Sequence, residues 1–345
     1  EGSGLKSNAF NSNVQLNWTL FDGMKMFIKR DKLRELEIAG ELNYKLKVEN
    51  TINELMRTYY DIVQKQKKTE LLKNSLEISN ERKNLAEEKL KMGSGSGLDV
   101  LQAIVDLNAD SSVFIQQEYD LLNAKTNLNL LMSRPAEVSF FVSTKINLKE
   151  NLLLNELSKS VSDSNLEVSL SRQNTVIAEL DWKQTKFSWL PELSLNSGIT
   201  FSRSSSQLGL LQFNQNLGMN VGFTAGWTLF DGFNQKRNRE VARLNFDNRV
   251  IEKKETELAV NSQLYQAYSS YKSSLQLLRI ERKNLEVSKE FFSLSLEKMR
   301  LEILSSIEFR IAQQKHLESE FRLILAEYQA KLSETELLRL SGKFK

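Results

Sequence analysis

A six-residue stretch that occurs twice most constrains what this chain can fold into. The residues Trp18–Gly23 return letter for letter as Trp227–Gly232. The pentapeptide Glu81–Leu85 likewise returns as Glu281–Leu285. The offset is about 200 to 209 residues, far longer than the ~20–50 residues of solenoid repeats. The sequence therefore predicts that one large unit has been duplicated.

The residues before each copy of the repeated stretch alternate between apolar and polar. Such runs cover about 13–20, 192–202 and 217–229. A period of two predicts β-strands, and the polar segment 203–215 predicts a long hairpin loop between the last two. The run 217–229 is long enough to cross a bilayer at a tilt, for which ~9–11 residues suffice. The alternative is a half-buried strand in the sheet of a soluble protein, and alternation by itself does not distinguish the two.

Long spans without turn signals separate these strands. Apolar residues spaced by three and four predict one helix over 24–91, about 100 Å long at ~1.5 Å per residue. The glycine-rich segment Gly93–Gly97 ends it, and a return helix is expected from 98 to 134. The second copy repeats this plan with a helix over 233–300, a turn at 301–306 and a return helix over 307–340. Each copy is therefore expected to form an antiparallel helical hairpin.

The remaining segments connect the copies. Residues 135–150 are mixed and partly β-like, with Val138, Phe140 and Val142 alternating, and they predict a small irregular belt. Residues 151–190 are expected to be helical, with a break near Asp163. We expect a mainly α fold with β, divided into a first transmembrane strand (1–22), a first hairpin (23–134), an equatorial linker (135–150), a helix leading to the membrane (151–190), a transmembrane β-hairpin (191–230), and a second hairpin with the C-terminus (231–345).

Composition argues against several classes of function. The net charge is only +3, and basic residues alternate with acidic ones, so we expect no nucleic-acid partner. The chain has no cysteine and no apolar run long enough for a transmembrane helix. Its one histidine, His316, has no second ligand in view, and we expect no catalytic residue, metal or cofactor. The turn at Gly93–Gly97 follows no strand and lacks the Lys-Ser/Thr ending of a phosphate loop.

The order of these parts resembles the TolC-type outer membrane efflux proteins, also called outer membrane factors. The resemblance rests on both copies of Trp-Thr-Leu-Phe-Asp-Gly, on the turn Gly97–Ala103, and on Trp189–Leu193 before a strand. It covers nearly the whole chain. The sequence departs from the family in showing three strands per chain where the family has four, so we expect a further strand upstream of residue 1.

The resemblance implies a homotrimer in the outer membrane of a Gram-negative bacterium. Strands of three chains would close a β-barrel in contact with outer-membrane lipid, and the helices would form an α-barrel in the periplasm. Such proteins are passive exit ducts of tripartite efflux or type I secretion systems. They are opened at their helical tips by a periplasmic adaptor that works with an inner-membrane transporter.

The resemblance also suggests functional residues. In the family the closed periplasmic mouth is lined by acidic side chains and latched by Tyr and Arg links, but no latch is recognisable in this sequence. Gate or tip candidates are Glu308, Asp99, Glu302 and Arg310. Adaptor-docking candidates are Gly93, Gly95, Gly97, Leu98, Leu304 and Ser305, and strand-to-helix hinge candidates are Asp22, Gly23, Asp231 and Gly232.

Each acidic candidate also has an ordinary explanation. Glu308 and Asp99 stand at helix starts, where the helix dipole favours a negative charge. For Glu308 this role and the gate role have equal support, whereas for Asp99 capping is favoured. Asp22 and Asp231 each stand where a strand passes into a helix, which also suggests capping. For the whole chain, the alternative to a duct is a soluble structural coiled-coil protein with a small β-sheet.

Overall fold

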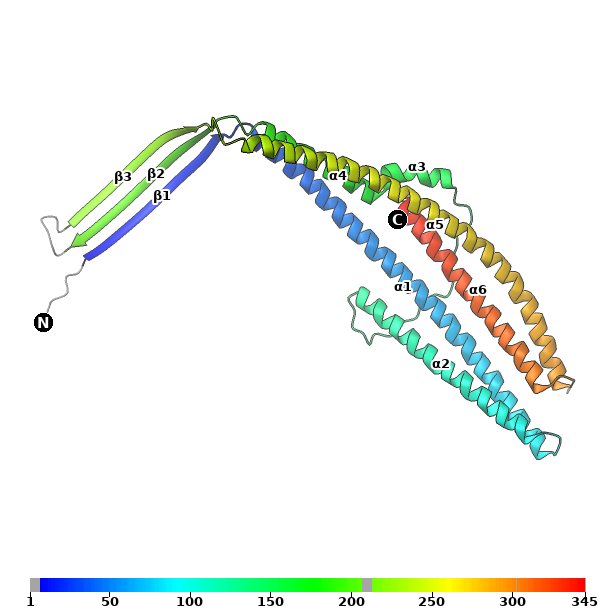
Figure 1. Cartoon of the computed structure of the whole chain (residues 1–345). Coiled ribbons are helices and arrows are strands. Elements are labelled where there is room, and N and C mark those ends of the chain that lie inside the picture. Colours follow the sequence, from blue (N-terminus) through cyan, green and yellow to red (C-terminus); the bar gives the residue numbers. More distant parts are fainter. Residues whose placement is uncertain (1–6, 207–212, 302, 345) are drawn as a thin grey trace, which may run out of the picture. The chain divides into compact units, whose positions relative to one another are not determined.

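The computed structural model describes residues 7–206, 213–301 and 303–344. Its strands are β1 (Ser7–Phe21), β2 (Glu192–Ser206) and β3 (Phe213–Gly226). Its helices are α1 (Lys25–Lys91), α2 (Gly97–Leu131), α3 (Leu154–Ser164), α4 (Leu166–Lys186), α5 (Asn234–Arg300) and α6 (Ser306–Leu340). Figure 1 shows their order along the chain. The predicted class, mainly α with β, is confirmed.

The duplication is visible in the lengths of the helices. α1 and α5 both have 67 residues, and α2 and α6 both have 35. Each helix of the second copy starts 209 residues after its counterpart, as Trp227 does after Trp18. The pentapeptide repeat at 281–285 is therefore out of register, because Glu81 corresponds by position to Glu290. The pentapeptide therefore does not mark equivalent positions in the two copies, whereas the repeat at Trp18–Gly23 does.

The described residues fall into two compact units, one within 1–43 and 169–256 and the other within 44–168 and 257–345. The first contains an antiparallel sheet in the order β1-β2-β3. Val14 pairs with Ile199, which pairs with Met219. Residues directly opposite one another share a face of a sheet, so the predicted alternation gives one apolar face and one polar face. The side chains of Val14, Ile199 and Met219 are exposed in the single chain.

Two expectations about the strands were wrong in detail. β3 ends at Gly226, so Trp227 and Leu229 lie beyond it. The reason is that Gly226 pairs with Glu192, the first residue of β2, and no partner strand continues past it. The hairpin connection is also shorter than expected, because the two strands take up the ends of the segment 203–215. Residues 207–212 lie outside the described part.

The repeated stretch forms the junction between strand and helix. In the first copy the Asp22 carboxylate accepts a hydrogen bond of 2.9 Å from the backbone N–H of Met26. In the second copy Asp231 accepts one of 2.7 Å from the N–H of Gln235. Both aspartates therefore satisfy an N–H group of the first helical turn, which confirms the expected capping role.

The glycine after each aspartate turns the chain into the helix. Gly23 and Gly232 have φ angles of 70° and 66°, in the left-handed region. Met24 and Phe233, which follow them, adopt similar values of 69° and 64°. Such angles cost a residue with a Cβ atom about 1–2 kcal/mol, which glycine avoids.

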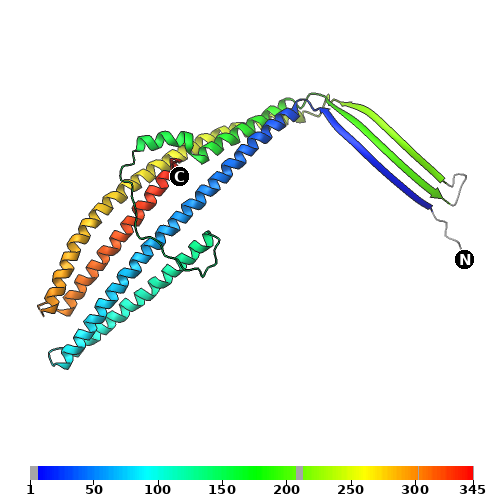
Figure 2. The same ribbon diagram turned by 180° about the vertical axis from the view of Figure 1, so that it is seen from behind.

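The second unit contains α2, α6 and the parts of α1 and α5 that follow residues 43 and 256, and these helices form two hairpins. Figures 1 and 2 both show α1 beside α2 and α5 beside α6. One buried cluster joins the first pair through Ile62, Val63, Ala124 and Leu128. A larger cluster joins the second pair to α3 and the start of α4: Leu157, Val161, Val168, Val260, Leu264, Tyr271, Leu275, Leu278, Ala326, Ala330, Leu337 and Leu340. Within the described residues, no helix is long and apolar enough to cross a membrane.

The linker 135–150 contains no strand within the described residues, although its residues alternate. Phe140 and Val142 instead pack on the cluster of α1 and α2, and Leu148 packs on the cluster of α5 and α6. Lys331 Nζ also donates a 2.8 Å hydrogen bond to the carbonyl of Asn147. Hydrophobic contacts to both hairpins thus replace strand pairing, and the linker connects them.

The expected break near Asp163 occurs at Asn165, between α3 and α4. Its side-chain oxygen accepts a 3.0 Å hydrogen bond from the N–H of Val168, so it caps α4. Its side-chain nitrogen donates one of 3.0 Å to the carbonyl of Leu340, near the end of α6. The break therefore attaches the connecting helices to the second hairpin.

The two junction glycines provide a matched test of this geometry. A Cβ atom at Gly23 would lie 2.9 Å from Cβ of Leu190 and 3.0 Å from the carbonyl oxygen of Phe187, whereas one at Gly232 meets nothing within 4 Å. We expect Gly232→Ala to cost about 1–2 kcal/mol from backbone strain alone. Gly23→Ala should cost more, because the same strain is joined by steric overlap. Melting temperatures from circular dichroism measure the difference, and equal losses would contradict it.

Candidate functional site at the hairpin tips

The turn between α1 and α2 forms the first tip. Gly93, with φ of 77°, follows the end of α1. Gly95 is required for space, because a Cβ atom there would lie 2.8 Å from the backbone nitrogen of Leu90. Gly97, by contrast, has nothing within 4 Å and an ordinary φ angle. Two of the three glycines named as docking candidates thus have a conformational role in the turn.

The turn between α5 and α6 forms the second tip. After Arg300 the backbone N–H of Ile303 donates a 2.9 Å hydrogen bond to the carbonyl of Lys298, and that of Leu304 donates one of 3.3 Å to the same carbonyl. Ser305 then caps α6. Glu302, one of the gate candidates, lies outside the described residues.

Glu308 and Asp99 hold equivalent positions, each three residues after a serine N-cap. Ser305 and Glu308 form a reciprocal capping box, in which the Glu308 carboxylate accepts hydrogen bonds of 2.7 Å and 3.0 Å from the hydroxyl and N–H of Ser305. These two bonds hold the pKa of the exposed Glu308 carboxyl below its usual value. Ser96 caps α2 by accepting from the N–H of Leu98, and Asp99 lies in the first turn. In the single chain both acids therefore occupy helix starts.

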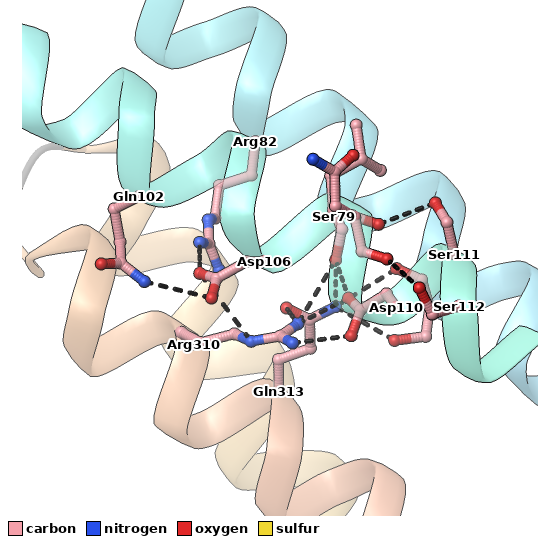
Figure 3. Close-up of polar contacts among 12 residues, drawn as sticks. Ser79, Arg82, Gln102, Asp106, Asp110, Ser111, Ser112, Arg310 and Gln313 are labelled. Carbon is pink, nitrogen blue, oxygen red and sulfur yellow. Dashed lines mark hydrogen bonds and ion pairs between the residues drawn. The ribbon is translucent and has the colours of Figure 1, made fainter.

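Arg310 is one of the residues through which the second hairpin contacts the first, near the tips (Figure 3). Its Nη2 lies 2.6 Å from Oδ1 of Asp110 in α2, and its Nη1 lies 2.7 Å from Oδ2. This bidentate geometry is the strongest form of Arg–carboxylate pairing. Both side chains are largely buried, at 13% and 14% exposure. A gate candidate of the second hairpin is thus bound to the first hairpin.

A second ion pair extends this contact along the first hairpin. Arg82 of α1 donates from Nη2 to Oδ2 of Asp106, and Gln102 Nε2 donates a 3.2 Å hydrogen bond to Oδ1 of the same carboxylate. Nε of Arg310 lies 4.0 Å from Asp106. Two arginines and two aspartates therefore alternate in one cluster with no net charge.

Hydroxyl and amide groups complete this cluster. Ser79 donates a 2.5 Å hydrogen bond to Oδ2 of Asp110. The side-chain nitrogen of Gln313 in α6 donates bonds of 3.2 Å to the hydroxyls of Ser75 and Ser79 in α1. We call Arg82, Asp106, Asp110 and Arg310, with Ser79 and Gln313, the tip network.

Electrostatics favour keeping this network assembled. The hydrogen bonds from Arg310 to Asp110 raise the pKa of that guanidinium, so it stays charged. Removing one partner of a fully buried ion pair costs about 3–5 kcal/mol, because the other charge is left without compensation. The cost here is smaller, because both side chains keep some contact with solvent.

The network leaves some donors unused. Among the described residues, Nε and Nη1 of Arg82 and Nε of Arg310 have no hydrogen-bond partner, although all three atoms are buried. A buried donor without a partner costs about 1–3 kcal/mol.

Sequence reasoning named Arg310 but missed its partners. The interaction joins residues 200 positions apart, and Asp106, Asp110 and Arg82 resemble the many other charged residues of the long helices. Their spacing of four places the two aspartates on one face of α2, which was the only sequence signal. The structure brings Arg310 to these residues, whereas Glu308 bonds to Ser305 of its own tip and Asp99 lies in the first turn of α2.

No group of three or more His, Cys, Asp or Glu in the described part could hold a metal ion. His316 stacks on Phe292 with ring centroids 4.9 Å apart. Burial lowers its pKa, with a smaller contribution from Lys289, so this histidine is a packed side chain between α5 and α6.

Comparisons with known proteins agree with this arrangement. The sequence profile of the outer membrane efflux protein family matches residues 1–134 and 157–343. No curated protein sequence matches the chain significantly. Among solved structures, the CmeC outer membrane channel of Campylobacter jejuni matches with a TM-score of 0.80 at 14% identity, over 99% of this chain and 78% of that one.

Two further outer membrane proteins show the same fold. VceC, an outer membrane protein of Vibrio cholerae, matches with a TM-score of 0.76 at 12% identity, over 98% of this chain and 86% of that one. The MtrE outer membrane channel of Neisseria gonorrhoeae, in its open state, matches with a TM-score of 0.72 at 14% identity, over 99% of this chain and 81% of that one. The chain therefore belongs to the outer membrane efflux protein family, and it is a TolC-like channel protein of the outer membrane that extends into the periplasm, not an enzyme.

Proposed function

We propose that three copies of this chain form a passive exit duct that the tip network holds closed. A periplasmic adaptor, working with an inner-membrane transporter, would open the duct by separating the two hairpins of each chain. The observation that carries this proposal is the bidentate ion pair between Arg310 and Asp110, because it joins the second hairpin to the first.

The sheet supports the use of several copies. β1 and β3 are the two edges of the sheet described here. In lipid every backbone polar group needs a partner, so such edges must be paired by strands of other chains. The exposed apolar face at Val14, Ile199 and Met219 suits contact with outer-membrane lipid.

The tips support docking of an adaptor. Leu98, Leu101, Leu301, Ile303 and Ile307 lie at or beside the two turns and are 63–74% exposed. Exposed apolar side chains gathered in one region mark interaction surfaces. We therefore keep Leu98 and Leu304 as proposed docking residues.

The strand-to-helix junctions are proposed as hinges. The residues concerned are Asp22, Gly23, Asp231 and Gly232. The hinge proposal rests on the left-handed backbone and capped helix at each junction.

Breaking the ion pair should open the duct. We expect Asp110→Asn to raise the open probability in planar bilayers about tenfold to a hundredfold, since charged hydrogen bonds worth about 1.5–3 kcal/mol are lost. Arg322→Gln is the matched control, because Arg322 pairs with Glu281 at 3.2 Å within the second hairpin. Single-channel recording measures both variants. An unchanged open probability for Asp110→Asn, or an equal rise in the control, would refute a latch at this position.

The gate role of Glu308 can be separated from its capping role. Gln at this position preserves the capping box but removes the charge. If three Glu308 side chains ring a narrow mouth, Glu308→Gln should reduce the preference for cations, because a ring of carboxylates attracts them. The reversal potential in a KCl gradient reports this preference. A cation preference equal to that of the unchanged protein would leave Glu308 with capping alone.

A further inference from the structure

One face of α2 carries apolar side chains that are exposed in the single chain. Four of them are 58–64% exposed, and two exposed polar residues complete steps of three and four along this face. In chain order the six are Val105, Asn108, Ser112, Ile115, Tyr119 and Leu122. This spacing is the heptad repeat with which one helix packs on another in a coiled coil. We call these six residues the α2 seam.

α5 carries a second face of the same kind. Five apolar residues there are 46–67% exposed, and one exposed asparagine completes the same steps. In chain order the six are Leu277, Ile280, Asn284, Val287, Phe291 and Leu294. We call them the α5 seam. The hairpin clusters use other faces of the two helices, at Leu128 and Leu278 for example, so each helix has a second apolar face.

The two seams lie on opposite sides of the paired hairpins. Figures 1 and 2 both show α1 and α6 between α2 and α5. The α2 seam of one chain therefore cannot meet the α5 seam of the same chain, but it can meet that of a second copy. Such a contact joins two different surfaces, and contacts of this kind close a ring. Because α2 leads away from the tip and α5 leads toward it, the two helices would run antiparallel.

Contacts within one chain fix the relative height of the seams. Asp110 of α2 bonds to Arg310 of α6. Phe309, the residue before Arg310, has its ring centroid 5.8 Å from that of Phe292 in α5. Asp110 and Phe292 therefore lie at about the same height along the hairpins. A threefold axis along the helices would place the α5 of a neighbouring copy at that height as well.

Two antiparallel registers match the steps of the seams near this height. In the first register Val105 faces Leu294, and Asp110 lies level with Lys289. The second register is shifted by one heptad, so that Asp110 lies level with Leu296. Both agree with the height given by the contacts to within four residues. A shift by a further heptad in either direction departs from it by ten residues or more.

Charged residues beside the seams favour the first register. In that register Glu118 lies beside Lys283, and both are exposed in the single chain. In the second register Glu118 would lie beside Glu290, and Lys125 beside Lys283. Charges that flank the seam of a coiled coil set its partner and orientation. The first register pairs opposite charges, whereas the second brings like charges together.

We propose that the α2 seam of one copy packs on the α5 seam of the next copy in the first register, with Glu118 beside Lys283. This inference rests on the trimer of the proposed function. It names the surfaces and the register through which the helical parts of neighbouring copies meet. The seams stop short of Leu98, Leu101 and Leu301 at the tips, which stay available to an adaptor.

Disulfide trapping tests the register, because the chain has no cysteine of its own. Tyr119→Cys combined with Ile280→Cys should give covalent dimers and trimers on denaturing gels after oxidation with copper phenanthroline, because these residues face each other in the first register. Tyr119→Cys combined with Val287→Cys is the matched control for the second register. A disulfide needs Cα atoms within about 7 Å, and one heptad displaces a helix by about 10 Å, so the control should stay monomeric on the gel.

Charge exchange tests the flanking pair in the same Tyr119→Cys and Ile280→Cys background. Glu118→Lys should slow cross-linking about twofold to fivefold, as expected for an exposed ion pair. Adding Lys283→Glu should restore the rate, because the opposite charges are then exchanged between the two helices. A misfolded helix would not be rescued by a second substitution. Equal slowing with and without Lys283→Glu would overturn the contact between Glu118 and Lys283.

The mass of the particle in detergent separates this inference from the proposed function. A trimer that cross-links through the control pair, or through neither pair, would overturn the register and leave the duct standing. Covalent dimers formed by Tyr119→Cys alone would show α2 packed on α2 of another copy, and would overturn the pairing with α5. A monomer in detergent would overturn the seam and the proposed trimer together.

Discussion

The long helices can exist only because each buries an apolar stripe against a neighbour. A helix of 67 residues gains little from backbone propensity alone, and most helical stability in proteins comes from tertiary packing. α1 and α5 obtain this packing from the return helices α2 and α6, through clusters that include Ile62 and Leu128 in one copy and Leu264 and Leu337 in the other. Each hairpin therefore stabilises its own long helix, and the duplication gives the chain two such hairpins.

Packing within the hairpins differs from the contact between their tips. The hairpin clusters are apolar, whereas the tips meet through arginine, aspartate, serine and glutamine. Apolar burial is non-directional, but a bidentate ion pair depends on geometry and is lost when its partners move apart. A polar contact thus suits the opening and closing proposed for the tips, and an apolar one suits a hairpin that stays folded. The linker at 135–150 packs on the apolar clusters of both hairpins and connects them away from the tips.

Much of this fold was predictable because local patterns determine it. The alternation of apolar and polar residues predicted the strands, and apolar residues spaced by three and four predicted the long helices. The position of Asp22 and Asp231 between a strand and a helix predicted their capping roles. Positions that depend on partners were less predictable. The strand β3 ends at Gly226 because its neighbour begins at Glu192, and alternation at Phe140 and Val142 leads to packing on helices instead of a strand. The tip network was not predicted, because it also depends on partners that are distant in the sequence. Nothing near Asp110 in the sequence indicates that Arg310 lies beside it.

The separation of the two tips is the most direct test of the account. The chain has no cysteine, so Leu101→Cys and Ile307→Cys, both at exposed positions beside the turns, accept spin labels at these two sites alone. Labelled chains diluted with unlabelled ones report the distance between hairpins within one chain by double electron–electron resonance. The account predicts one narrow distance distribution in the unchanged background and a longer, broader one after Arg310→Gln. A distribution unaffected by Arg310→Gln would show that the ion pair does not hold the tips together, and would contradict the latch.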